Sequence, residues 1–277
     1  MNTRQVGALA VTAISDGVLY TNHDVILGVG REESARLTGV AYGQPLPLDV
    51  NSFLIRHGGK LILSDAGSGH TMQPTLGKLP QNLRAIGVDP AAIDIVMLTH
   101  LHSDHSLGLV DEAGQAVFPN AELMIHEVEA AFWLDRALQP DDHERITRNS
   151  KAQRAVTAPY RDRIRRISDG EVLPGIAAML RPGHTPGHTN WLLQSGGERL
   201  LIWGDIVHLA PVQLARPEAR LIYDVDTDLA AATRQKVLEW AAAERLVVAG
   251  AHLEFPGFGR VERAGERFII KAELATA

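Results

Sequence analysis

The sequence predicts an α+β fold in which two mixed β-sheets pack face to face and helices cover both outer faces. Three observations support this prediction. Strand-like and helical segments occur in both halves of the 277-residue chain, 45% of the residues are hydrophobic, and no Pro- or Ser-rich linker interrupts the pattern. Two sheets covered by helices would bury these apolar runs in one core. We therefore expect a single domain over residues 1–277.

The N-terminal part of the chain is expected to begin as antiparallel sheet. Strand-like runs separated by turn signals occupy residues 8–14, 50–56 and 60–64. Because His57-Gly58-Gly59 connects the last two runs, we expect them to form a β-hairpin.

A helix and a buried strand are expected next. Leucine and isoleucine recur at helical spacing over residues 76–86, and Gly87 follows as a stop signal. Residues 93–98 form a short run rich in Ile and Val, as expected for a strand buried on both faces. The polar segment from Thr99 to His105 would then lie at the carboxyl end of that strand.

The second half of the chain mixes the same two patterns. Helical patterns cover residues 127–138, 141–156 and 229–243. Strand-like runs occupy residues 121–125, 176–180, 191–194, 200–203, 246–249 and 267–271. This distribution supplies strands for two sheets and helices for both outer faces.

Composition excludes several classes of function. The formal net charge of −6, without any Lys/Arg-rich run, argues against a nucleic-acid partner. No cysteine is present, so any metal must be held by nitrogen and oxygen. The apolar segment of residues 6–14 lacks a small-residue cleavage site and is interpreted as a strand. No run is long enough to span a bilayer, so we expect a cytoplasmic protein with no membrane partner.

One short segment carries the strongest functional signal. His100-Leu101-His102-Ser103-Asp104-His105 places three imidazoles and a carboxylate directly after the predicted buried strand. Side chains two residues apart on an extended segment point the same way, so His100 and His102 can bind one ion. Asp104 and His105 then remain available for a second ion. Imidazole and carboxylate are ligands that borderline divalent cations prefer.

The motif His-x-His-x-Asp-His, followed by x-x-Gly at Gly108, resembles the signature of metallo-β-lactamase-fold hydrolases. Further segments resemble the same family along nearly the whole chain: Leu63-Ser64-Asp65-Ala66-Gly67, Pro182-Gly183-His184-Thr185-Pro186-Gly187-His188-Thr189, Gly204-Asp205 and Ala251-His252. The resemblance implies the αββα arrangement of the metallo-β-lactamase fold.

The resemblance also implies a set of metal ligands. One ion would be bound by His100, His102 and His188, the other by Asp104, His105 and His252, and Asp205 would bridge both. Either His184 or His188 could be the ligand in their shared loop; the family pattern favours His188 and leaves His184 as a supporting residue. Asp65 is expected to orient a ligand histidine without touching metal.

Two divalent ions about 3.5–4 Å apart would hold a bridging hydroxide as nucleophile and polarise the substrate. Asp104 and Asp205 are the expected catalytic carboxylates, with Asp104 orienting the hydroxide or passing a proton to the leaving group. Zinc suits the ligands best, whereas iron, manganese or cobalt is allowed at one site.

The aspartate at position 205 is similar to that of lactonases, glyoxalase-type thioesterases and phosphotriesterases, where many β-lactamases have cysteine. The chain most resembles the methyl parathion hydrolase group and its lactonase and esterase relatives, through Pro74-Thr75-Leu76-Gly77-Lys78-Leu79, Phe118-Pro119-Asn120-Ala121, Phe132-Trp133-Leu134 and His252-Leu253-Glu254-Phe255-Pro256-Gly257. Met72, Trp133 and His208 are the candidate pocket residues; His208 stands where lactonases have an assisting tyrosine, and Trp133 could equally belong to the core.

We therefore expect a zinc-dependent hydrolase that cleaves a small-molecule carboxylic ester or lactone, with phosphotriester hydrolysis as a side activity. Two alternatives remain at this point: a dedicated organophosphate phosphotriesterase, and a non-catalytic metal-binding protein. A homodimer is implied by analogy with the family alone.

Overall fold

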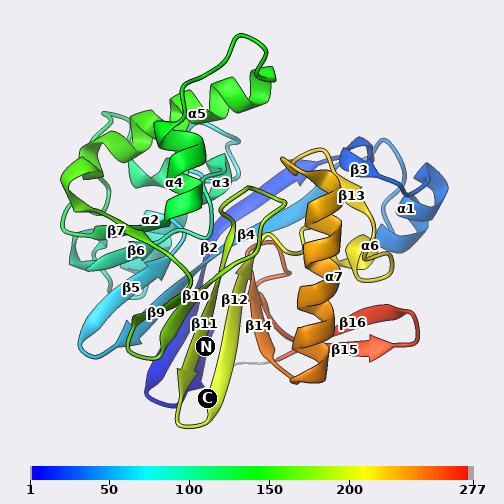
Figure 1. Cartoon of the computed structure of the whole chain (residues 1–277). Coiled ribbons are helices and arrows are strands. Elements are labelled where there is room, and N and C mark those ends of the chain that lie inside the picture. The colour runs from blue at the N-terminus through cyan, green and yellow to red at the C-terminus, as the bar shows by residue number, and fades with distance from the viewer. Residues whose placement is uncertain (1, 274–277) are drawn as a thin grey trace.

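The computed structural model describes residues 2–273. Two seven-stranded sheets face each other, and helices lie on the outer face of each (Figure 1). The predicted α+β sandwich is confirmed. The apolar core between the sheets draws on both of them, for example Val11 and Phe53 from one sheet and Trp191 and Ile202 from the other. Such a shared core explains why strand-like runs in both halves of the chain are so rich in branched and aromatic residues.

The N-terminal sheet has the order β1-β2-β4-β5-β6-β7-β8. Its first four strands are antiparallel, and β5 to β8 are parallel. The expected hairpin is confirmed, since His57 pairs with Lys60 across the turn. The strands are β1 (Thr3–Val6), β2 (Leu9–Thr21), β4 (Leu46–His57), β5 (Lys60–Ser64), β6 (Ile95–Met97), β7 (Glu122–His126) and β8 (Ile164–Ile167).

The C-terminal sheet has the order β16-β15-β14-β12-β11-β10-β9. All neighbours are antiparallel except β12 and β14, which run parallel. Its strands are β9 (Gly170–Leu173), β10 (Ile176–Leu180), β11 (Thr189–Ser195), β12 (Glu198–Gly204), β14 (Val247–Gly250), β15 (Phe258–Ala264) and β16 (Arg267–Ala272). A separate two-stranded ribbon pairs β3 (Ile26–Leu27) with β13 (Arg220–Leu221).

Helices on the two faces differ in length. The C-terminal sheet is covered by α7 (Thr227–Ala243), whereas shorter helices cover the N-terminal sheet (Figure 1). The remaining α-helices are α1 (Arg31–Thr38), α2 (Leu79–Ala85), α3 (Ser103–Ser106), α4 (Glu127–Ala130), α5 (Glu144–Thr157) and α6 (Ala210–Gln213). Short helices of other types are η1 (His23–Val25), η2 (Pro90–Ala92), η3 (Leu107–Leu109), η4 (Ala131–Asp135) and η5 (Ala158–Arg163).

Several element boundaries differ from the sequence prediction, most clearly those of two helices. The helix expected over residues 76–86 begins only at Leu79, because Gly77 adopts a left-handed conformation and donates its N–H to the buried Asp16 carboxylate. The helix expected over residues 127–138 becomes a π-helical turn, η4, and ends at Asp135. Within residues 2–273, no helix combines the length and apolar character that a bilayer crossing requires.

Candidate metal centre

The candidate site lies where strands of both sheets end. Strand β6 leads into the segment that carries His100 and His102, and Asp104 and His105 follow in α3. The parallel strands β12 and β14 end just before Asp205 and His252. Because the carboxyl ends of neighbouring parallel strands meet at one sheet edge, residues far apart in the chain converge there.

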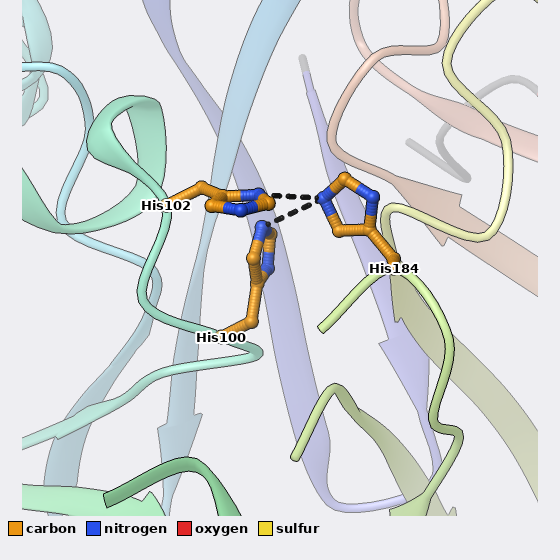
Figure 2. A group of neighbouring side chains, drawn as sticks. All are labelled: His100, His102 and His184. Atoms are coloured by element: carbon orange, nitrogen blue, oxygen red, sulfur yellow. Dashed lines mark hydrogen bonds between the residues drawn. The ribbon is translucent and has the colours of Figure 1, made fainter. Parts of the chain in front are cut away.

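A first cluster consists of His100, His102 and His184. Nε2 of His184 lies 2.8 Å from Nδ1 of His102 and 3.2 Å from Nε2 of His100. Figure 2 shows the three rings converging on one point from two loops. All three side chains are buried, and together they offer ligand atoms close enough for one ion.

A second cluster consists of Asp104, His105 and His252. One Asp104 carboxylate oxygen lies 3.3 Å from Nε2 of His252 and 3.6 Å from Nε2 of His105. Asp205 lies between the clusters. Its Oδ2 is 3.2 Å from Nε2 of His184, and its Oδ1 is 3.2 Å from Nε2 of His105 and 3.3 Å from Nε2 of His252. Each carboxylate oxygen of Asp205 therefore faces a different cluster.

The two histidines of the 182–189 loop occupy the reverse of their expected positions. His184, expected as a supporting residue, faces His100 and His102. His188, expected as the ligand, accepts a hydrogen bond at Nε2 from the Asp205 backbone N–H, 3.0 Å away. His188 immediately precedes β11, so its ring lies beneath the Asp205 backbone; a Cβ on Gly204 would come within 2.7 Å of it. The expected placement of this pair is thus wrong.

Oxygen atoms orient three of the clustered imidazoles. Asp65 lies 3.0 Å from Nδ1 of His105, as expected for an orienting carboxylate. Asp224 accepts from Nδ1 of His184 at 2.8 Å, and the Asp49 carbonyl accepts from Nδ1 of His252 at 2.9 Å. In each ring the bond at Nδ1 leaves Nε2 directed at the clusters. Such outer partners are typical of metal-binding histidines.

Glu129 is not among the site residues predicted from the sequence. This fully buried carboxylate accepts hydrogen bonds from Leu101 N–H and Trp133 Nε1 through one oxygen, and from Thr185 Oγ1 and Gly187 N–H through the other. It therefore joins the His100–His105 segment to the His184–His188 loop. Burial raises its pKa, although the four hydrogen bonds act in the opposite direction. No distinct signal in the sequence indicated this role, because Glu129 is one of three acidic residues, with Glu127 and Asp135, in the helix predicted over residues 127–138.

Protonation in the cluster fits a cation-binding role. Burial holds the pKa of His100 and of His102 well below the usual value, so both rings are neutral. Burial also lowers the pKa of His184 and His252, but hydrogen bonds and charges from neighbouring aspartates outweigh it and raise these values to about 9 and about 10. The charges of the neighbouring aspartates thus favour positive charge at these two rings.

Buried polar atoms without hydrogen-bond partners provide an independent test of whether the two clusters fit bound metal ions. Nε2 of His105 and Oδ1 of Asp205 are buried without a hydrogen-bond partner among the described residues, yet they face each other. Buried polar atoms normally have partners, so this pair indicates a site for a bound group. The donor set of imidazole and carboxylate fits divalent metal ions.

A pocket of about 290 Å³ opens over the two clusters. Met72 and His208 line it, in agreement with their selection as pocket residues. Trp133 does not. Its side chain is fully buried in the core and its Nε1 donates to Glu129, so the structure favours its core role. Other lining residues include Leu19, Tyr20, Leu48, Arg145, Arg148, Asn149 and Tyr223.

Comparison with known families decides the assignment. The model of the metallo-β-lactamase superfamily matches residues 45–252, a span that includes both clusters. The chain belongs to the metallo-β-lactamase superfamily. Its membership accounts for the two facing sheets and for the position of the clustered histidines and aspartates at their edge.

Two solved structures are similar to this chain over almost its full length. A hydrolase named AbOPH, in the β-lactamase superfamily, is 30% identical with a TM-score of 0.93, covering 99% of this chain and 98% of that one. AidC, a dizinc quorum-quenching lactonase in complex with an L-homoserine product, is 25% identical with a TM-score of 0.91 and the same coverage.

Curated sequence relatives match shorter stretches. The uncharacterised protein YobT of Bacillus subtilis (strain 168) is 28% identical over 167 residues, which is 60% of this chain and 65% of that protein. An N-acyl homoserine lactonase of Bacillus thuringiensis is 24% identical over 123 residues, which is 43% of this chain and 42% of that protein. The chain thus covers less than two thirds of the length of either relative.

Proposed function

We propose that this protein is a binuclear metal-dependent hydrolase that cleaves a small-molecule carboxylic ester or lactone. The observation that carries the proposal is the position of Asp205, whose two oxygens face two separate three-residue clusters. The similarity to a dizinc lactonase over nearly the whole chain supports the same activity.

The proposed metal ligands follow the two clusters. One ion would be held by His100, His102 and His184, the other by Asp104, His105 and His252, with Asp205 shared. Two bound divalent ions would supply Lewis-acid polarisation of the scissile carbonyl and a water that ionises near neutral pH. Zinc suits this donor set, and iron, manganese or cobalt is compatible with one position.

The side chains around the clusters have separate tasks. Burial raises the pKa of the Asp104 carboxyl, but the charges of His105 and His252 outweigh this effect and hold the pKa below its usual value. The carboxylate is therefore ionised, and it can accept a proton from water and pass a proton to the leaving group. His208 also lines the pocket, and its Nε2 lies 3.0 Å from a carboxylate oxygen of Asp205. Burial lowers the pKa of His208 to about 4, so the neutral imidazole is available to hydrogen-bond a substrate oxygen.

Metal analysis combined with a substrate panel tests the proposal. Protein purified without chelator should contain two metal ions per chain by mass spectrometry. It should hydrolyse lactones and aryl esters with higher kcat/KM than phosphotriesters, which we expect as a side activity. Faster phosphotriester turnover would identify a dedicated phosphotriesterase instead. No turnover of any class by fully loaded protein would favour a non-catalytic metal-binding role. A cytoplasmic location, a single domain and a homodimer stay predictions.

A further inference from the structure

The pocket has one cationic wall. Helix α5 contributes three residues to this wall: Arg145, Arg148 three positions later, and the adjacent Asn149. Positions three apart on a helix share a face, so both guanidinium groups lie on the side of α5 that borders the pocket. Among the described residues, the only carboxylates that line this pocket are those of Asp104 and Asp205, which both belong to the candidate metal centre.

Arg145 is held rigidly on this wall. Its guanidinium donates to the backbone carbonyl of Ile222 and, at 3.1 Å, to that of Asp224. The side chain is about half buried, and burial and the positive charge of Arg148 lower its pKa while the charge of Asp224 opposes that change. The Asp224 carboxylate is itself engaged by His184 and by the Leu221 N–H.

Neither guanidinium has a carboxylate partner. Among residues 2–273, no Asp or Glu oxygen lies within 4.0 Å of a side-chain nitrogen of Arg145 or Arg148, whereas the exposed Arg166 and Arg216 do have such a partner. Two like charges on one helix face repel each other. A bound anion would relieve that repulsion.

Apolar side chains form another part of the same pocket: Leu19, Leu48 and Met72. A substrate that fits both parts has an aliphatic segment and an anionic group. The reacting carbonyl would lie over the metal clusters, where His102, Asp104 and His252 line the floor.

We propose that Arg148, with Arg145 and Asn149, forms an anion subsite that binds a carboxylate of the substrate remote from the scissile ester. The inference rests on the proposed ester or lactone hydrolysis and names its preferred substrate class: esters or lactones with a free carboxylate on the acyl chain. Guanidinium is suited to this task because its planar donors match the two oxygens of a carboxylate.

A matched pair of substrates tests the subsite. The mono-4-nitrophenyl ester of adipic acid and the 4-nitrophenyl ester of hexanoic acid have acyl chains of equal length, and only the first has a terminal carboxylate. The wild-type enzyme should hydrolyse the charged ester with about tenfold higher kcat/KM, as expected for one charge-assisted hydrogen bond. Raising the ionic strength should reduce this preference, since the wall is partly exposed to solvent.

Variants of α5 assign the preference to a residue. Arg148→Ala should abolish the preference by raising KM for the charged ester more than KM for the neutral ester, and Arg148→Lys should retain part of the preference. The control is Lys151→Ala, which removes one positive charge from an exposed position of the same helix outside the pocket. This variant should keep the wild-type preference.

The outcomes separate this inference from the proposed function. Equal kcat/KM for the two esters in the wild-type enzyme, or an unchanged preference in Arg148→Ala, would overturn the anion subsite and leave the hydrolase intact. Loss of the preference in Lys151→Ala as well would attribute it to general charge and would also overturn the subsite. Failure to hydrolyse either ester, with two metals bound, would instead count against the proposed function.

Discussion

The two halves of the candidate metal centre are encoded differently. The N-terminal half contributes His100, His102, Asp104 and His105 from six consecutive residues, whereas the C-terminal half contributes His184, Asp205 and His252 from three separate loops. The compact motif depends on local geometry alone. The dispersed residues depend on the packing of β11, β12 and β14, and one of them was placed wrongly from the sequence. Substitutions that change one half of the centre at a time test this contrast.

The largest effect is expected at the residue that joins the two clusters. Asp205→Ala removes both carboxylate oxygens between them and leaves His105 and His252 without their shared partner. We expect metal content to fall to one ion or fewer and kcat/KM to drop on the order of 10³-fold or more, because several kcal/mol of charge stabilisation are lost. Mass spectrometry and ester kinetics measure both. Two retained ions with near-normal activity would contradict the bridging role.

Metal affinity should depend steeply on pH. In the metal-free protein the pKa values of His184 and His252, about 9 and about 10, keep both rings protonated at neutral pH. Their folded-state pKa values are raised, so a metal must displace these protons at any pH below 9. Apparent affinity should therefore fall about tenfold per displaced proton for each pH unit of acidification. Calorimetry in buffers of different ionisation enthalpy counts the protons; metal uptake without proton release would contradict the assignment.

The two histidines of the 182–189 loop give the sharpest test of the corrected ligand set. His184→Ala should lose one ion, because the ring faces His100 and His102. His188→Ala should keep two ions and lose activity by about 10–100-fold, since His188 supports the Asp205 backbone from outside the clusters. Metal stoichiometry distinguishes the two variants even if both lose activity. Loss of an ion only in His188→Ala would restore the sequence-based ligand choice.

The sequence predicted the fold and most of the centre for physical reasons that can be stated. Apolar runs with strand or helix periodicity identified most elements, and the His100–His105 motif sits directly after a buried strand, as expected. The choice between His184 and His188 failed because both lie in one Gly/Pro-rich loop, where spacing does not determine which ring faces the cluster. Asp224 and Glu129 were missed because the site segments that they hold lie far away in the chain: His184 is 40 positions from Asp224, and Leu101 is 28 positions from Glu129.

Glu129 connects the two halves, and its variants should affect them unequally. One oxygen accepts from Leu101 and Trp133, the other from Thr185 and Gly187. An amide can replace the first oxygen as an acceptor, but its NH₂ group would face the Gly187 N–H, so two donors would meet. Glu129→Gln should therefore disturb the loop of His184 more than the segment of His100.

We expect Glu129→Gln to weaken metal binding by about tenfold and to recover activity when excess metal is supplied, as for other changes outside the ligand set. Glu129→Ala leaves four buried donors without an acceptor and should lower Tm by roughly 10 °C as well. Glu127→Gln is the matched control, because Glu127 is exposed on the same short helix. If Glu129→Gln lost stability without any change in metal affinity, Glu129 would be a core residue and not the connection between the two ligand loops.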